Sequence, residues 1–237
     1  MRAVSADGRG ALAARMTRAD IRRALLAAPS APGDDMAWLR GTTGDVEARV
    51  RAAMPERCVH AAVLVPLIER ASAWTVLLTR RSAALKDHAG QISFPGGRIE
   101  AADTDVRAAA WREAEEEIGL AGDALEFAGY LPDHLILTGF RVTPVVAFVG
   151  ADPVLALDAD EVDEAFEVPL DFLFDGANHR TRVRRVGDLT LEMIDVPYGV
   201  HNIWGATAAM LMSLRGMLIA AGADLAARSE PRPAESR

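Results

Sequence analysis

The segment at 112–119 reads Arg-Glu-Ala-Glu-Glu-Glu-Ile-Gly, and it constrains this chain more than any other segment. An α-helix turns about 100° per residue, so Glu113, Glu116 and Glu117 fall on one face of a helix here. The closing glycine is a natural helix C-cap, and a helix is expected from Asp105 to Ile118. Each like-charge pair three or four residues apart costs about 0.2–0.5 kcal/mol even when exposed. The face is therefore either a solvated charged surface or a site that holds a cation.

The surroundings of this face favour the cation. Oxygen-only clusters suit Mg²⁺ or Mn²⁺, and Mg²⁺ is typically held by one or two carboxylates together with substrate phosphates. Glu113 and Glu117 are one helical turn apart, which suits a shared ion. Arg112 lies at the edge of the same face, where it can pair with an acid and orient the cluster. Just upstream, Gly96 and Gly97 allow backbone carbonyls and a substrate to come close.

The rest of the chain predicts an α/β fold with a mixed sheet between helical layers, because strand-like and helical segments alternate irregularly. At 237 residues it can bury a core without a disulfide or structural metal. Pro66 is expected at an edge or a bulge. Strands are expected at 59–68, 74–79, 125–131, 142–149 and 189–196, helices at 18–28 and 203–221, and a short helix or turn at 170–174. The expected units are an N-terminal helical extension (1–56), one domain (57–227) and a disordered tail (228–237).

Composition excludes several classes of protein. The net charge of −8 and the pI of about 5.2 argue against a nucleic-acid binder. Cys58 is the only cysteine, so an intrachain disulfide and a Cys-x-x-Cys zinc site are excluded. No run of about 18 apolar residues suggests a membrane span, and no long apolar core suggests a secretory signal, so a cytoplasmic protein is expected. The N-terminal helix is expected to pack on the core or on a second subunit, which leaves a homodimer open.

The pattern Arg-Glu-x-x-Glu-Glu-x-Gly, preceded by Gly-Gly, resembles the Nudix box, the signature of hydrolases that act on nucleoside diphosphates linked to another moiety. In the general box, five residues separate the glycine from a glutamate, and seven residues separate that glutamate from Arg-Glu. Here five residues separate Gly97 from Asp103 and eight separate Asp103 from Arg112, so the box is one residue longer and Asp replaces Glu.

The segment upstream explains this departure. Residues 77–97 contain Leu-Leu-Thr-Arg-Arg-Ser, then a leucine, a histidine, Gly-Gln and Phe-Pro-Gly-Gly. They are similar, nearly position for position, to the signature of the coenzyme A diphosphatase branch of the Nudix family, which carries the same lengthened box. Later blocks at 138–146, 166–170 and 203–208 resemble that branch in the same order. The resemblance runs from about residue 59 to residue 214.

The resemblance implies an α/β/α sandwich with a mixed β-sheet and a Mg²⁺- or Mn²⁺-dependent hydrolase. The implied substrate is coenzyme A or an acyl derivative, cut to 4′-phosphopantetheine or its acyl form and adenosine 3′,5′-bisphosphate. Another nucleotide derivative, such as ADP-ribose or an oxidised nucleoside triphosphate, is the alternative substrate. A non-catalytic nucleotide-binding regulator is a third interpretation, but such domains typically lose box glutamates, and all of them are present here.

The resemblance also implies roles for individual residues. Arg112 would orient the cluster with Asp103 as its partner, and the general base is left open between Glu116 and a carboxylate of the acidic loop at 158–166, either Glu161 or Glu164. Solvated loop charge is the simpler interpretation of those two loop glutamates. Arg81 is expected to contact substrate phosphate or to form a structural salt bridge, and His88 has a substrate role or a structural one. The expected metal ligands are Glu113, Glu116, Glu117 and the carbonyl of Gly97, and the expected substrate-binding residues are Arg81, His88, Gly96 and Gly97.

Overall fold

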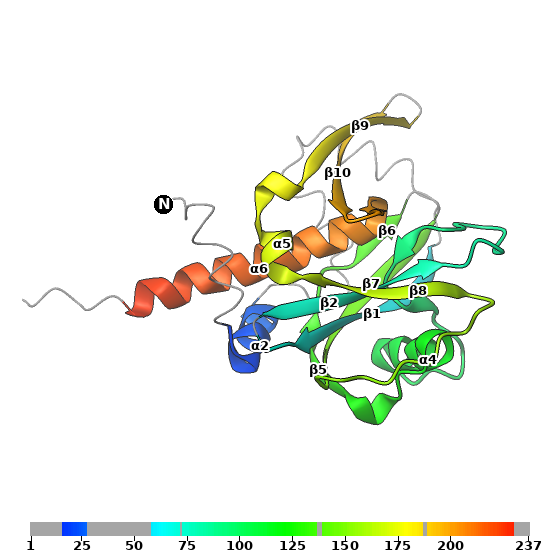
Figure 1. The fold of residues 1–237 in the computed structure, drawn as a ribbon, viewed down its shortest axis with the longest axis horizontal. Coiled ribbons are helices and arrows are strands. Elements are labelled where there is room, and N and C mark those ends of the chain that lie inside the picture. Colours follow the sequence, from blue (N-terminus) through cyan, green and yellow to red (C-terminus); the bar gives the residue numbers. More distant parts are fainter. Residues whose placement is uncertain (1–15, 28–57, 72, 137–138, 187–188, 230–237) are drawn as a thin grey trace, which may run out of the picture.

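The computed structural model describes residues 16–27, 58–71, 73–136, 139–186 and 189–229. Within this part of the chain, eight strands form one mixed sheet with helices on both faces (Figure 1). The strands are β1 (Val59–Glu69), β2 (Trp74–Arg81), β3 (Ile92–Ser93), β4 (Gly96–Arg98), β5 (Leu125–Tyr130), β6 (His134–Ile136), β7 (Phe140–Val149) and β8 (Val162–Pro169). The helices are α2 (Arg18–Ala27), α4 (Val106–Ile118), α5 (Leu170–Phe174) and α6 (Gly205–Ser229).

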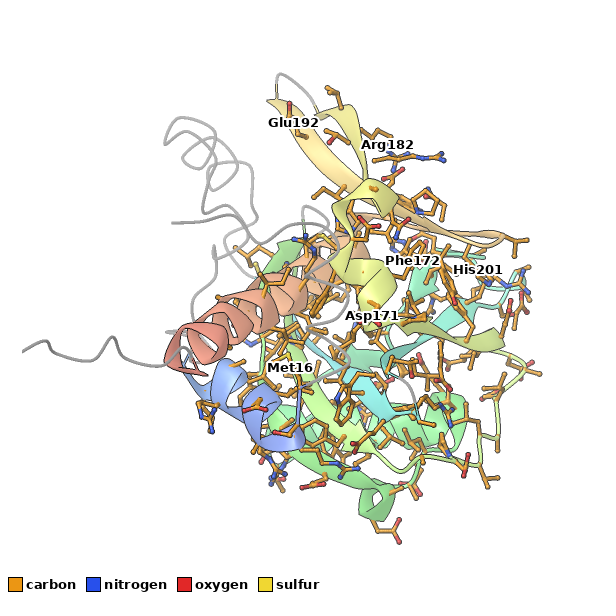
Figure 2. The ribbon with its side chains drawn as sticks, turned by 60° about the vertical axis from the view of Figure 1, so that its left-hand side comes forward. Met16, Asp171, Phe172, Arg182, Glu192 and His201 are labelled. Atoms are coloured by element: carbon orange, nitrogen blue, oxygen red, sulfur yellow. The ribbon has the colours of Figure 1, made fainter. Side chains whose placement is uncertain are left out.

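The sheet has the central order β3-β2-β1-β7-β5, while β4 pairs with β1, β6 with β7 and β8 with β2. Strand β1 runs parallel to β7 and antiparallel to β2 and β4. A smaller sheet of β9 (Arg180–Val186), β10 (Leu189–Tyr198) and β11 (His201–Ile203) adjoins it. The hairpin of β9 and β10 projects from the body and carries Arg182 and Glu192 (Figures 1 and 2).

Alternation along the strands creates an apolar core on each face of the sheet. Helix α4 covers one face, where its buried alanines and Ile118 pack against β1, β2 and β7. Helices α2, α5 and α6 cover the other face. This arrangement confirms the expected α/β/α sandwich, and it places the glutamate helix α4 on one face of the sheet.

The expectation for Pro66 is wrong, because β1 lies in the middle of the sheet and Pro66 pairs in register with Ala147 of β7. On its other side, β1 changes partner at this point. Val63 is the last residue in register with β4, and Leu67 is the first in register with β2. The missing N–H of the proline therefore falls in the gap between two partner strands, where no ladder bond is lost.

The interpretation of 158–166 as a loop is also wrong over most of its length. Residues from Val162 onward form β8, which pairs with β2 along its whole length. Its acidic residues, at 163, 164 and 167, interrupt the alternation of apolar side chains and hid this strand in the sequence. Strand β9, with the sequence Arg-Thr-Arg-Val-Arg-Arg-Val, was not expected for the same reason.

Helix α2 confirms the expected helix near the N-terminus and shows that it packs on the core. The hydroxyl of Thr17 accepts a hydrogen bond from the N–H of Asp20 at 3.2 Å, which caps the helix. Ile21 and Leu25 are buried against the sheet. The indole N–H of Trp74 donates to the carbonyl of Met16 at 2.8 Å. The remainder of the predicted extension, 1–15 and 28–56, and the tail from 230 lie outside the described residues.

Helix α6 is longer than expected and runs through the predicted boundary at 227/228 to Ser229. Its single strong charge before residue 223, Arg215, donates to the carbonyl of Phe174 at 2.9 Å. Within the described chain, residues 205–222 are the one helical stretch that is long and apolar enough to cross a membrane by length and composition, and 39% of this stretch is buried. Leu211, Leu214 and Leu218 are fully buried in the core, so the expectation of a buried helix holds for one face.

Candidate active site

Both ends of helix α4 are capped by hydrogen bonds, and the helix directs its glutamates toward the glycine turn. The side chain of Asp105 accepts from the N–H of Ala108 at 2.7 Å and caps the first turn. At the other end Gly119 adopts a left-handed conformation with φ of 69°, and its N–H bonds the last carbonyls of the helix. The buried face, with Ala110 and Ala114, holds α4 against the sheet.

The glycine turn at β4 fits against α4 only because it lacks side chains. A Cβ on Gly97 would lie 2.5 Å from Oε1 of Glu113, and a Cβ on Gly96 would overlap the carbonyl of Ala62. Gly96 also has a φ of 152°, which L-residues with a side chain rarely adopt. The two glycines therefore bring main-chain atoms into contact with the glutamate face.

Glu117 is the most enclosed of the three glutamates, with 3% of its residue surface exposed. The N–H of Gly96 donates to its Oε2 at 3.3 Å, and Nη1 of Arg81 lies 3.7 Å from its Oε1. Burial raises the pKa of Glu117 to about 8, and the charges of Glu113 and Glu161 act in the same direction. Arg81 and the Gly96 N–H oppose this rise only in part. The carboxylate therefore lacks a strong compensating cation.

Arg112 uses its guanidinium to hold the acids in place. Its Nε and Nη2 each donate to Asp103 at 3.1 Å, and Nη2 also donates to the carbonyl of Arg98 at 3.0 Å. Its Nη1 donates at 2.9 Å to both Glu113 and Glu116. This bidentate contact confirms the expected pairing of Arg112 with Asp103. The pairing forms although the box is one residue longer than the general pattern.

The charged groups of this network shift one another's pKa values. The bond from Arg112, with help from the N–H of Glu100, holds the pKa of Asp103 below its ordinary value. The bond to Asp103 likewise raises the pKa of Arg112. Burial raises the pKa of Glu113, although Arg112 partly offsets it. The carbonyl of Arg98 and the amide of Glu100 were missed by the sequence reasoning, since main-chain groups leave no signal in residue identity.

The two loop glutamates that were candidate bases lie in different surroundings. Glu161 lies in the loop that is hydrogen-bonded to the C-terminal end of α4, beside the box, and its charge raises the pKa of both Glu113 and Glu117. Its main chain is held by bonds to Ser82 at 2.8 Å and to Asp158 at 3.1 Å. The N–H of Asp158 in turn donates to the carbonyl of Glu117 at 3.0 Å, so this loop is hydrogen-bonded to the C-terminal end of α4.

Glu164, by contrast, lies on β8, forms an ion pair with Arg80 at 3.4 Å, and lies 3.5 Å from Nε2 of His201. The His201 ring stacks on Phe166 with 3.9 Å between the ring centres (Figure 2 labels His201). The remaining candidates are more exposed. Glu116 has 60% of its side chain exposed, and the Nδ1 of His88 lies 3.0 Å from Oε1 of Gln91 within the β2–β3 loop.

The donor set fits a divalent cation of the Mg²⁺ type. The described residues contain no group of three or more His, Cys, Asp or Glu side chains arranged around one point, so no cage of such side chains is preassembled there. Glu113 lies against Gly97, and Glu117 accepts a hydrogen bond from the N–H of the neighbouring Gly96, so two carboxylates and the carbonyls of this turn offer oxygen ligands. Mg²⁺ is bound by one or two carboxylates with waters and substrate phosphates completing the shell. This set therefore suits an ion that arrives with, or is completed by, a phosphate.

A mixed sheet lies between helices, and Arg112 holds a carboxylate helix against a glycine turn, an arrangement that offers the oxygen ligands required by a hydrolase that uses divalent metal ions. Residues 59–186 match the model of the NUDIX domain, and the chain therefore belongs to the Nudix family and is a Nudix hydrolase.

Similar proteins span most of the domain. The chain is 41% identical over 156 residues to "Uncharacterized Nudix hydrolase NudL" of Escherichia coli O7:K1 (strain IAI39 / ExPEC), covering 65% of this chain and 80% of that protein. Among solved structures, a MutT protein from Methanosarcina mazei Go1 is 19% identical with a TM-score of 0.44, covering 72% of this chain and 98% of that one. The Nudix hydrolase RenU from M. smegmatis is 22% identical with a TM-score of 0.45, covering 68% and 87%.

The contact between Gly97 and Glu113 leads to a prediction. Gly97→Ala is expected to weaken Mg²⁺ binding and to lower kcat/KM about tenfold, because the new methyl group must displace the Glu113 carboxylate. Thermal unfolding should change little, since the clash is with the end of a flexible side chain. Gly176→Ala, where nothing lies within 4 Å of the new Cβ, is the matched control. Unchanged Mg²⁺ affinity in Gly97→Ala would show that this carboxylate does not bind the ion.

Proposed function

We propose that this Nudix hydrolase cleaves the diphosphate of coenzyme A or of an acyl-coenzyme A. The observation that carries the proposal is the 3.7 Å contact of Arg81 with Glu117. Arg81 belongs to the segment that resembles the coenzyme A diphosphatase branch, and this contact joins that segment to the box. The proposed products are 4′-phosphopantetheine, or its acyl form, and adenosine 3′,5′-bisphosphate.

Glu113, Glu117 and the carbonyl of Gly97 would hold Mg²⁺ or Mn²⁺, with Glu116 as a further ligand. A bound divalent cation neutralises charge on the diphosphate and lowers the pKa of a water molecule. Arg112 keeps Glu113 and Glu116 in position through its anchor on Asp103. The backbone of Gly96 and Gly97 allows the substrate to approach, and Arg81 and His88 would bind its phosphate groups.

We assign the general base to Glu161. A water molecule attacks one phosphorus atom and gives its proton to the carboxylate, the anhydride bond to the bridging oxygen breaks, and the second phosphate leaves. The bonds to Ser82 and Asp158 that hold Glu161 beside the box support this role. Glu116 is the second candidate, but Arg112 already occupies its carboxylate. Glu164 is disfavoured by its pairing with Arg80 and His201.

The test is mass spectrometry of the products after incubation with coenzyme A, with and without Mg²⁺ or Mn²⁺. Metal-dependent release of 4′-phosphopantetheine and adenosine 3′,5′-bisphosphate is the expected result. ADP-ribose and an oxidised nucleoside triphosphate form the comparison arms. Cleavage of either of these, with coenzyme A left intact by a folded sample, would overturn the substrate assignment while leaving the Nudix chemistry in place. The choice of ion, the cytoplasmic location and the homodimer stay predictions.

A further inference from the structure

Two arginines contact the carboxylates that would hold the metal ion, and they differ in how many hydrogen bonds hold each guanidinium in place. Arg112 donates to Asp103, to the carbonyl of Arg98, and to Glu113 and Glu116, all between 2.9 and 3.1 Å. Loss of any one of these bonds would leave the others in place. Arg112 is therefore a fixed part of the site, whatever else binds there.

Arg81 is held more loosely. Its Nη1 lies 3.7 Å from Oε1 of Glu117, which is an ion-pair distance longer than a hydrogen bond. A quarter of its side chain is exposed, whereas that of Glu117 is almost fully enclosed. Its main chain, in contrast, is fixed, because its N–H bonds to Gln91 and its carbonyl accepts from Gly90. The guanidinium can therefore turn on a rigid strand end without any change in the fold.

We infer that Arg81 is an exchangeable counterion, which pairs with Glu117 while the site holds no divalent cation and turns to the diphosphate of the substrate once a cation binds this carboxylate. The inference rests on the proposed metal-dependent diphosphatase function, but not on coenzyme A as the substrate. A cation on Glu117 repels the guanidinium, and the planar fork of arginine matches phosphate oxygens.

The exchange predicts effects of opposite sign on two ligands. While Arg81 stays on Glu117 it competes with the metal ion for the same oxygen. After release it adds a charge-assisted contact to the phosphate. Binding of the cation and of the anion is then positively coupled, and by linkage each strengthens the other. If Arg81 bound phosphate without ever pairing with Glu117, its removal would affect only anion binding. If Arg81 and Glu117 formed a purely structural ion pair, Arg81 would assist the binding of neither ligand.

Calorimetric titration of the full chain with Mg²⁺ alone, and then with methylenediphosphonate at saturating Mg²⁺, tests the inference. With all variants measured at the same pH, Arg81→Ala is expected to bind Mg²⁺ several-fold more tightly than the wild type. The same variant should bind the diphosphonate about tenfold more weakly, the effect of one lost charge-assisted contact. Arg81→Lys, which keeps the charge without the fork, should leave Mg²⁺ binding unchanged and weaken only the diphosphonate.

Arg80→Ala is the matched control, because Arg80 is the preceding residue on β2 and pairs with Glu164 instead. It should change neither titration. Weaker diphosphonate binding without tighter Mg²⁺ binding in Arg81→Ala overturns the exchange, and so does unchanged diphosphonate binding. If Arg81→Ala does not fold, Arg81→Lys carries the test: its diphosphonate affinity must fall. Failure of wild-type protein to bind Mg²⁺ would overturn the metal site and the exchange together, whereas failure to cleave coenzyme A would affect neither titration.

Discussion

Glu117→Gln is expected to lower kcat at least about a thousandfold, since a bound cation contributes several kcal/mol to stabilising charge in the transition state. The amide has the same shape but no charge, so it keeps the hydrogen bond from Gly96 and loses the attraction for the ion. Turnover of the diphosphate substrate and Mg²⁺ affinity by calorimetry are the two measurements. Both should fall while the thermal unfolding temperature is preserved or raised.

Glu115→Gln is the matched control for this variant. Glu115 lies on the same helix, two residues away, and its side chain is exposed to solvent. The substitution removes the same charge without touching the glutamate face, so activity should stay within about twofold, as for surface substitutions in general. Full activity in Glu117→Gln would refute the assignment of this carboxylate to the metal site.

Raising the pH from about 6.5 to about 8 should destabilise the metal-free protein by about 1 kcal/mol. The pKa of Glu117 is raised to about 8, so the folded state keeps a proton that the unfolded state has already lost. Stability therefore falls as the pH rises toward 8. Burial lowers the pKa of His134 to about 4, so below about pH 6.5 the unfolded state binds a proton that the folded state does not, and stability rises with pH. The window for Glu117 therefore starts at about 6.5.

Urea unfolding in the presence of a chelator, at several pH values across this window, measures the effect. Glu117→Gln should not show this loss of stability, because it carries no titratable group at this position. Added Mg²⁺ should restore the stability lost at the upper end, since it binds the folded state. A flat profile in the wild type would mean that Arg81 and the Gly96 amide already keep Glu117 ionised in the folded protein.

The sequence alone was sufficient to predict those helices, strands and pairings that depend only on residues close together in the chain. Asp105 and Gly119 delimit α4, and the spacing of its glutamates sets which of them share a face. Apolar runs predicted β1, β2, β5 and β7 to within a few residues. The pairing of Arg112 with Asp103 could be expected because both residues belong to one motif.

Contacts between distant segments were decided only by the tertiary structure. Strand β8 is stabilised by its ladder with β2 rather than by its own composition, and this pairing separates Glu161, beside the box, from Glu164, paired with Arg80. The register of β2 and of the β1–β4 ladder carries Arg81 and Gly96 to Glu117. Residue identity alone predicted acids suited to a cation. The burial that raises the pKa of Glu117, and the arginine that faces it, arise from packing, because desolvation depends on what all the surrounding segments exclude.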